Sequence, residues 1–442
     1  MFLITFCTKA QEVTFEILNS KGNAELFQLE GEKTDKIDSV FLQNGIFQFS
    51  IKGKLSGFYR LQFDNKHWID FINDGKDVEL KTDYSNILDN LKVIESESNK
   101  LYYEFLKLNK AYKTKTELLQ LILTRYPKDD EYYLTTQKKL LEVQNDYKQF
   151  VTKTSQVDIN SFIARYIKSA QLPEINGTLS IKEQLDYLKK HSLDNVDFND
   201  DEMIYSNLFT NKSIEYLTYY RNPQLSKPLL EKEFIKAVDT LLTKARINDI
   251  VYQHITDYLV DGFTKFGFDN IIDYIITNYV LVDDLCLNEE TENSIQNRVN
   301  QAKLFKVGET VPNIIIPNTS GKSIDLSEIK SNKTLILFYA SWCTHCQTMI
   351  PEIKDIYDNS SRETLEVLAI SLDTNNEEWH NFIDDNGLKW LNASDLKGWD
   401  CQAAELYYIY ATPTMFLIDK DMKIIAKPLT IEELKLEIDK AP

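Results

Sequence analysis

Hydrophobic and polar positions follow three different patterns along the chain, and each pattern predicts a different architecture. From residue 13 to residue 82, short runs of alternating, β-branched or aromatic residues are separated by glycine-containing turns. Six of the thirteen glycines lie between Gly22 and Gly75, in keeping with many tight turns. We therefore expect a small antiparallel β domain, with strands at Val13–Leu18, Ile46–Ile51, Phe58–Phe63, Trp68–Ile72 and Val78–Leu80.

The central stretch has the periodicity of helices. Only three glycines, at positions 177, 262 and 267, lie between residues 101 and 300, and apolar residues recur three and four positions apart. Proline interrupts the pattern at positions 127, 173, 223 and 228, so we expect an all-α domain of several helices. Two of the apolar sets are Leu118, Leu119, Ile122 and Leu123, and Ile235, Val238, Leu241, Leu242 and Ala245.

Strands and helices alternate from Gly308 onward, which predicts a parallel α/β core. The multidomain chain is thus expected to contain an antiparallel β domain at residues 11–90, an all-α domain at 91–305 and an α/β domain at 306–442. In the last domain we expect strands at Pro312–Ile316, Lys333–Tyr339 and Leu365–Leu372, a hairpin of Thr414–Ile418 and Lys423–Ala426, and helices at Thr348–Tyr357, Glu377–Asp385 and Ile431–Asp439.

Residues 1–10 are expected to be the remnant of a secretory signal. They form an apolar stretch that ends in the small residue Ala10, where we place the cleavage site. The mature chain is therefore expected to be exported, to the periplasm or cell envelope. Cys7 is an alternative acceptor for a lipid anchor, but Phe6 stands where lipoprotein signals have a small residue, so a lipoprotein is the less favoured interpretation.

Composition disfavours several classes of partner. The 442 residues include 50 Lys and Arg against 68 Asp and Glu, a net charge of −18 that repels nucleic-acid phosphates and anionic lipid headgroups. We therefore expect no nucleic-acid partner. After the N-terminal stretch, no run approaches the roughly 18 apolar residues of a membrane span, so no stable span is expected. Five cysteines in so long a chain are too few for a disulfide scaffold.

The chemistry is expected at Cys343 and Cys346, which follow the apolar strand Lys333–Tyr339 at the start of a helix. A cysteine at a helix N-terminus is stabilised as a thiolate, the nucleophilic form, by the helix dipole and by free backbone N–H groups. Cys346, one turn further along, lies on the same face within disulfide reach. The pair can therefore close and reopen a reducible ring.

Metal binding is the alternative for a Cys-x-x-Cys pair. A tetrahedral zinc site needs a second pair of ligands, and the sequence offers only the isolated cysteines Cys286 and Cys401 for this role. Copper held by both cysteines and His345 is conceivable because thiolates suit Cu(I), although His345 lies on a different helix face from Cys346. We expect no metal and no cofactor. Cys401 is interpreted as a packing residue, with a disulfide to Cys343 or to Cys286 as alternatives.

The residues around the cysteines resemble a known family. The run from Trp342 to Cys346, the proline at Pro351 and the segment Ala411–Asp419 resemble the exported thioredoxin-like reductases of the TlpA/ResA type. The resemblance covers residues 308–442 and implies a thioredoxin-like fold for this part of the chain.

The same resemblance implies how a substrate would be held. Pro413 is expected to be a cis-proline opposite the cysteines, 70 residues after Cys343, as in the TlpA/ResA branch with its extra strand and helix. Thr412 and Pro413 would present their backbone to a substrate peptide as an added strand, and Trp342 would complete the binding surface.

Two positions depart from the family pattern. Leu337 stands where thioredoxin has a buried Asp, and Met349 stands where ResA-like proteins have a Glu, so the usual proton acceptor for Cys346 is missing. His345 resembles the residue at this place in disulfide isomerases and DsbA-like oxidases. As an imidazolium it would favour the Cys343 thiolate and make the pair more oxidising, whereas a solvated residue of little effect is the alternative interpretation.

We predict a thiol-disulfide oxidoreductase in which Cys343 attacks a disulfide of an exported protein and Cys346 resolves the mixed disulfide. The reductase direction is favoured, with an unidentified redox partner; an oxidase-like or isomerase-like poise set by His345 is the alternative. A peroxidase is disfavoured because Ala340 stands where peroxiredoxins have Thr or Ser. In a further alternative, residues 13–300, which loosely resemble the N-terminal regions of Bacteroidetes-type proteins, bind a client and the thioredoxin-like domain is a docking scaffold.

Overall fold

The computed structural model describes residues 11–177, 179–283, 285 and 293–440. The chain divides into two compact units, Met1–Ile271 and Ile272–Pro442. Among the described residues, no helix is long and apolar enough to cross a membrane. The segment expected to be a signal remnant, with Cys7, and the isolated Cys286 both lie outside the described residues.

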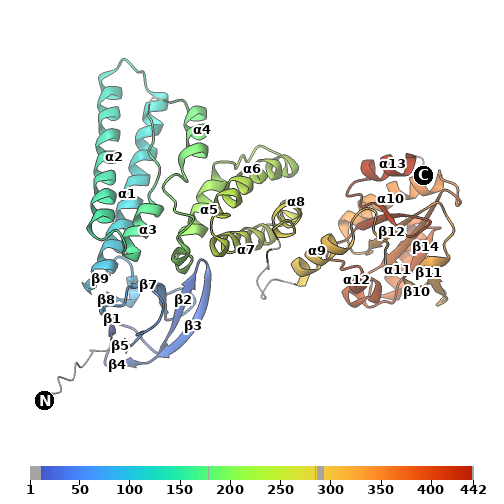
Figure 1. Cartoon of the computed structure of the whole chain (residues 1–442), viewed down its shortest axis with the longest axis horizontal. Helices are drawn as coiled ribbons and strands as arrows, with labels where there is room; N and C mark the ends of the chain where they lie inside the picture. The colour runs from blue at the N-terminus through green and yellow to red at the C-terminus, as the bar shows by residue number, and fades with distance from the viewer. Residues whose placement is uncertain (1–10, 178, 284, 286–292, 441–442) are drawn as a thin grey trace. The chain divides into compact units, whose positions relative to one another are not determined.

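Two β-sheets pack against each other at the start of the first unit, drawn in blue in Figure 1. One sheet has five strands in the order β4-β5-β1-β8-β9, and the other has four in the order β3-β2-β6-β7. Phe15, Phe47 and Phe71 are fully buried between the two sheets. The strands are β1 (Val13–Leu18), β2 (Ala24–Glu30), β3 (Lys33–Val40), β4 (Leu42–Gln43), β5 (Ile46–Phe49), β6 (Gly57–Gln62), β7 (Trp68–Asn73), β8 (Val78–Asp83) and β9 (Lys92–Glu95).

The β domain is antiparallel as predicted, apart from one parallel pair formed by β1 and β8. It is also larger than the hydrophobic pattern indicates. The pattern misses β3 because this edge strand is mostly exposed and charged, and it misses β2, which pairs with β3. β9 extends the five-stranded sheet to Glu95, beyond the domain end expected at residue 90.

Helices fill the rest of the first unit, and α1 and α2 form a long antiparallel hairpin (Figure 1). The prolines separate helices as predicted: Pro127 lies in the loop between α1 and α2, and Pro228 lies in the first turn of α6. The helices are α1 (Glu97–Arg125), α2 (Glu131–Val157), α3 (Phe162–Ala170), α4 (Ile181–His191), α5 (Leu208–Thr218), α6 (Lys227–Ala245), α7 (Asp249–Lys265) and α8 (Asp269–Ile275).

A buried amide joins the β domain to the helices. Asn99, in the first turn of α1, accepts a hydrogen bond from the Ile72 N–H at 2.8 Å and donates one to the Ile72 carbonyl oxygen at 2.9 Å. The side chain thus satisfies both backbone groups of a residue on the edge strand β7. Phe58 on β6 also packs edge-on against Tyr102 of α1, with 4.8 Å between ring centroids. The β domain and the helices therefore share buried contacts.

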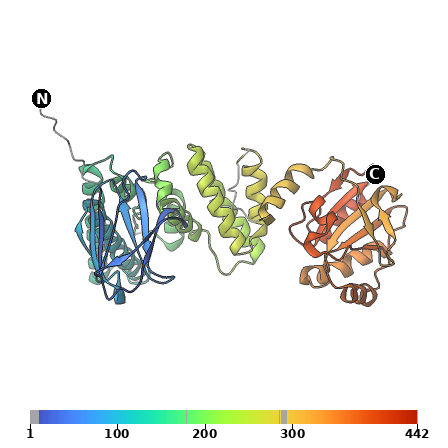
Figure 2. The ribbon, with the colours of Figure 1, turned by 90° about the horizontal axis from the view of Figure 1, so that it is seen from below.

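The second unit is built on a five-stranded sheet of order β14-β13-β12-β15-β16. Figure 2 shows this part in orange and red, with helices around the sheet. β12, β13 and β14 are parallel to one another, whereas β15 and β16 run antiparallel to their neighbours. All seven residues of β12 are buried, as expected for a central strand covered on both faces. This is a thioredoxin-like arrangement.

The elements of the second unit follow in chain order, with the π-helix η3 first. They are η3 (Ile276–Val280), α9 (Asn293–Leu304), β10 (Ile315–Pro317), β11 (Ser323–Asp325), β12 (Lys333–Tyr339), α10 (Thr344–Asp358), β13 (Leu365–Ser371), α11 (Asn376–Asn386), β14 (Leu391–Ala393), α12 (Gln402–Leu406), β15 (Thr414–Asp419), β16 (Ile424–Ala426) and α13 (Ile431–Asp439).

Helix α9 packs on the thioredoxin-like domain, although the sequence pattern assigns it to the helical domain. The Gln301 amide donates to the Tyr407 carbonyl oxygen at 3.1 Å, and the Phe305 ring lies 5.0 Å from the Tyr407 ring. The division between the two units falls after Ile271. The boundary expected at residue 305 therefore lies inside the second unit.

Candidate active site

The turn between β12 and α10 brings the two predicted cysteines together. Cys343 is the N-cap residue of α10, and its Sγ accepts a hydrogen bond from the Cys346 N–H at 3.3 Å. A sulfur in this position lies at the positive end of the helix dipole, which favours the thiolate. Both cysteines are free thiols in this structure. Cys343 is 8% exposed and Cys346 is fully buried, so Cys343 is the nearer of the two to solvent.

The loop before β15 forms the wall opposite the cysteines. The Cys343 thiol donates a hydrogen bond to the Thr412 carbonyl oxygen at 3.3 Å. The peptide bond between Thr412 and Pro413 is cis, as the family resemblance implies. β15 pairs with β12 in register up to Phe338 opposite Thr414, and this pairing holds the loop beside the end of β12. The sheet thus brings together two residues that are 69 positions apart in the chain.

The two thiols differ in acidity. Burial raises the pKa of Cys343, but hydrogen bonds with the side chains of Cys346 and Thr412 and with backbone N–H groups outweigh burial and hold this pKa below its ordinary value. Burial and the hydrogen bond to Cys343 raise the pKa of Cys346 to about 12. Cys343 is therefore suited to attack as a thiolate, while Cys346 keeps its proton in the resting dithiol.

The remaining residues singled out from the sequence lie around this pair. Trp342 is 53% exposed and places a large apolar side chain next to Cys343. His345 is exposed in the first turn of α10, and its side chain makes no hydrogen bond or salt bridge with the part of the chain that the structure describes. Leu337 is fully buried in β12 and Met349 is partly buried on α10, so both line apolar core.

A buried carboxylate behind the active-site turn was missed by the sequence reasoning. Asp373 follows β13 and is 1% exposed. It accepts hydrogen bonds from the Ser341 N–H at 3.1 Å, from the Ser341 hydroxyl at 2.5 Å and from the Ser371 hydroxyl at 2.5 Å. These bonds anchor the residue two positions before Cys343 to the end of β13. The sequence did contain a signal for this residue, because Asp373 comes directly after the buried strand predicted at Leu365–Leu372.

Asp373 also lies near a buried phenol. Burial raises the pKa of Tyr339 well above its ordinary value, a hydrogen bond with Trp379 opposes this, and the charges of Asp373 and Cys346 raise it further. The Trp379 indole N–H donates to the Tyr339 oxygen at 3.0 Å. Tyr339 is therefore a titratable group close to both the buried carboxylate and the buried thiol.

The third described cysteine lies elsewhere in the same domain. Cys401 is free, fully buried and at the start of α12, and burial raises its pKa to about 11. This burial fits the interpretation of Cys401 as a packing residue. Among the residues that the structure describes, no group of three or more His, Cys, Asp or Glu side chains is placed to hold a metal ion.

Comparison with known proteins establishes the family. The AhpC/TSA family model matches residues 307–427. The thiol-disulfide oxidoreductases ResA from Bacillus thuringiensis strain Al Hakam and from Bacillus anthracis are each 30% identical to this chain over 121 residues, which cover 27% of this chain and 68% of theirs. The chain belongs to the TlpA/ResA-like thiol-disulfide oxidoreductases.

Solved structures similar to this TlpA/ResA-like chain include two from Bacteroides species. A thiol-disulfide oxidoreductase from Bacteroides fragilis NCTC 9343 is 26% identical and covers 29% of this chain and 98% of its own, with a TM-score of 0.26. A thioredoxin-like protein from Bacteroides caccae covers 61% of this chain and 98% of its own at 20% identity, with a TM-score of 0.37. The TlpA/ResA-like assignment rests on the C-terminal domain, where the family model matches.

We expect the substitution Asp373→Ala to lower the free energy of unfolding by roughly 1–3 kcal/mol, because it leaves the donors of the partly buried Ser341 and the buried Ser371 without this acceptor. It should also slow the reaction of Cys343 with disulfides, since the turn before Cys343 loses its anchor. Urea unfolding measures the first effect. Asp384→Ala, at an exposed position on α11, is the matched control and should change the free energy little. Equal unfolding free energies for the two variants would contradict the assigned anchor.

Iodoacetamide should alkylate Cys343, the more acidic thiol, before Cys346. Only the thiolate reacts, and its fraction rises as the pH rises through the pKa. Because the pKa of Cys343 is lowered and that of Cys346 is raised to about 12, Cys343 should reach half-maximal reactivity at a lower pH than an ordinary thiol, while Cys346 and Cys401 stay unlabelled at neutral pH. Mass spectrometry of the labelled peptides identifies the site. Labelling of Cys346 before Cys343 would be incompatible with the assigned order.

Proposed function

We propose that this protein reduces disulfide bonds in exported proteins, with Cys343 as the attacking residue and Cys346 as the resolving residue. The observation that carries the proposal is the asymmetry of the pair. Cys343 is 8% exposed and has a lowered pKa, whereas Cys346 is fully buried and has a pKa raised to about 12. A metal ligand set or a structural disulfide needs no such asymmetry between its sulfurs.

The proposed reaction is a pair of thiol-disulfide exchanges. The Cys343 thiolate attacks one sulfur of a substrate disulfide, an S–S bond forms to the enzyme, and the other substrate sulfur leaves as a thiolate. That leaving thiolate takes the proton of Cys346. The Cys346 sulfur then attacks the sulfur of Cys343, which closes the enzyme disulfide and releases the second substrate thiolate. Two electrons pass to the substrate, and a dithiol redox partner must return two electrons to the enzyme.

The surface beside Cys343, along Thr412 and Pro413, is proposed to be the substrate groove that holds the substrate backbone. Thr412 and Pro413 precede β15, and the Thr412 carbonyl oxygen already accepts a hydrogen bond from the Cys343 thiol. A peptide lying along this loop could pair with it as an added strand, which orients the disulfide for attack. The exposed ring of Trp342 would cover the apolar part of such a peptide.

Export and reductase direction are parts of the same proposal. The apolar segment ending at Ala10 supports export to the periplasm or cell envelope. The reductase direction rests on the resemblance of residues 308–442 to the thioredoxin-like reductases of the TlpA/ResA type. The lowered pKa of Cys343 stabilises the reduced form and acts in the opposite, oxidising direction. An oxidase-like or isomerase-like poise requires an additional stabilising charge, and His345 is the residue that could supply it.

Cys346→Ser should trap substrates as mixed disulfides on Cys343, because the resolving sulfur is removed and the attacking sulfur remains. Cys343→Ser should trap none and should show no insulin reduction, although its melting temperature should stay close to that of the wild type. Non-reducing gels, followed by mass spectrometry of the trapped species, distinguish the two variants. Insulin reduction by Cys343→Ser would refute the assigned nucleophile, and an unfolded Cys343→Ser protein would instead indicate a structural role for the pair.

The substitution His345→Pro should lower the reduction potential by at most roughly 20 mV, because an exposed charge that makes no hydrogen bond to the sulfur would stabilise a thiolate by at most about 1 kcal/mol. His345→Gln separates the loss of charge from the backbone effect of proline and should show most of the same decrease. Equilibration with a glutathione series measures each potential. Equal potentials for the wild type and His345→Gln would show that His345 does not tune the pair.

A further inference from the structure

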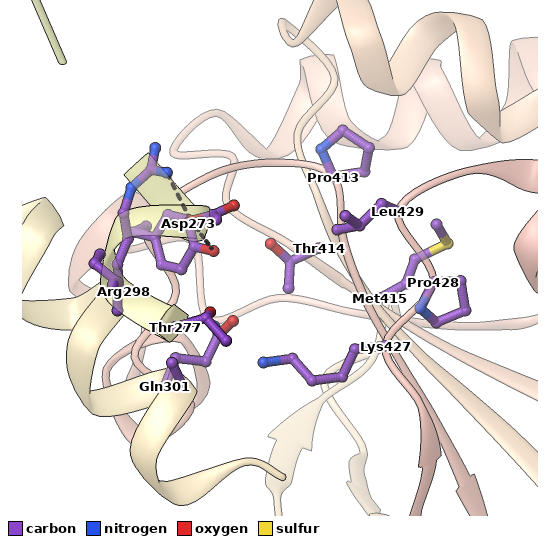
Figure 3. A pocket seen from close by; sticks show the side chains of 13 residues that line it. Asp273, Thr277, Arg298, Gln301, Pro413, Thr414, Met415, Lys427, Pro428 and Leu429 are labelled. Carbon is purple, nitrogen blue, oxygen red and sulfur yellow. Dashed lines mark hydrogen bonds and ion pairs between the residues drawn. The ribbon is translucent and has the colours of Figure 1, made fainter. Parts of the chain in front are cut away.

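A cavity of about 250 Å³ lies beside Pro413, within the second unit. Its walls come from η3 and α9, from residues 413–415 at the start of β15, and from residues 427–429 after β16 (Figure 3). The volume is below the roughly 300–1,000 Å³ of sites for drug-sized ligands. It suits a single side chain better than a cofactor.

Lys427 lines the cavity, and its ammonium group forms no salt bridge with the residues that the structure describes. Figure 3 shows the Lys427 ammonium group pointing from the 427–429 segment toward Thr277 and Gln301. Among the residues that the structure describes, the ammonium makes no hydrogen bond or salt bridge, and its closest ring contact is Phe416 at 5.5 Å. Burial lowers the pKa of Lys427, and the charge of Asp273 partly opposes this.

The other charges on the wall already have partners. Arg298 on α9 forms a salt bridge with Asp273 at 3.0 Å and stacks over the Tyr410 ring at 4.4 Å. The lining residues therefore carry two cationic side chains, Lys427 and Arg298, against one carboxylate. In a chain with a net charge of −18, this is a local excess of positive charge. Such a cavity attracts a carboxylate and repels an ammonium group.

The cavity adjoins the proposed substrate groove through one residue. The Thr412 carbonyl oxygen accepts a hydrogen bond from the Cys343 thiol, and the next residue, Pro413, lines the cavity. A peptide strand advances about 3.3 Å per residue, and its successive side chains point to opposite sides. A side chain one to three positions from the substrate cysteine can therefore turn into the cavity while the cysteine reacts.

We propose that this cavity is a specificity pocket that binds an acidic side chain of the substrate, near the cysteine under attack, through Lys427. The inference rests on the proposed function, because it assumes that a peptide disulfide reacts at Cys343. Arg298, held by Asp273 and Tyr410, positions the wall opposite Lys427 and adds to the positive potential. Since α9 and η3 supply much of this wall, the segment before the thioredoxin-like domain takes part in choosing substrates.

The test compares peptides that each contain one intrachain disulfide and that differ in a single residue. Glu, Gln or Lys is placed at each of the three positions on either side of the first cysteine, and kcat/KM is measured for every peptide. At the best position we expect the full-length protein to prefer Glu over Gln by roughly threefold to tenfold, as for one partly buried charge-assisted hydrogen bond. Raising the salt concentration to about 0.5 M should reduce this preference.

Substitutions at two lysines of the same hairpin separate specific binding from general charge. Lys427→Gln should abolish the preference for Glu over Gln, and Lys427→Glu should reverse it in favour of Lys. Lys423→Gln changes the net charge equally but at an exposed position, and its preference should match that of the wild type. A preference that survives in Lys427→Gln, or that is absent at all six positions in the wild type, would overturn the proposed pocket.

Two further measurements separate this inference from the proposed function. Reduction of hydroxyethyl disulfide, which is too small to span the groove and the cavity, tests the exchange reaction alone. Fluorescence anisotropy with a labelled Glu peptide in which serine replaces both cysteines tests the pocket without exchange. Weaker binding to Lys427→Gln than to Lys423→Gln supports the pocket even if the wild type fails to reduce hydroxyethyl disulfide. Equal binding to both variants overturns the pocket even if reduction is fast.

Discussion

The active site depends on the hydrogen bond between the Cys346 N–H and the sulfur of Cys343 at the start of α10. In this geometry the Cys343 sulfur replaces the side-chain oxygen that usually caps the N-terminus of a helix. The hydrogen bond that caps α10 therefore also stabilises a thiolate at Cys343. The helix then buries Cys346 one turn further along. One local interaction thus produces two thiols of different exposure and different acidity, which is what sequential exchange at two sulfurs requires.

The surroundings of this capping bond are held by groups from other parts of the sheet. Asp373 fixes the turn through Ser341, and the pairing of β12 with β15 sets the Thr412 carbonyl oxygen against the Cys343 thiol. Leu337 is buried and Met349 is partly buried, at the two positions where thioredoxin and ResA-like proteins have an acid. At these two positions the interior behind the cysteines is therefore apolar. Buried polar groups are costly unless they are satisfied, and Asp373 is satisfied by three hydroxyl or N–H donors on two serines.

The helical segment before the thioredoxin-like domain is more than a linker. α9 is fixed by the hydrogen bond of Gln301 to the backbone at Tyr407, and it carries Arg298 to the wall of the cavity beside Pro413. In the proposed specificity pocket, this added element changes the charge beside Pro413, while the turn that carries the two cysteines is unaltered.

The sequence alone determined the elements and the reactive pair. Continuous apolar runs predicted β12 and β13. The Cys-x-x-Cys spacing at a strand-to-helix turn pointed to the two candidate catalytic cysteines, because helix capping and dipole effects act over a few neighbouring residues. The sequence pattern missed the exposed edge strand β3. It grouped α9 with the helical domain, whereas α9 contacts the thioredoxin-like domain through Gln301, because local periodicity does not encode the packing partner of a helix. Only the tertiary structure decided that Asp373 lies behind Ser341 and that Lys427 shares a cavity with Arg298. Asp373 and Ser341 are 32 positions apart, and the pairing of β12 with β13 brings them together. Lys427 and Arg298 are 129 positions apart, and the packing of α9 on the thioredoxin-like domain places both on the wall of one cavity.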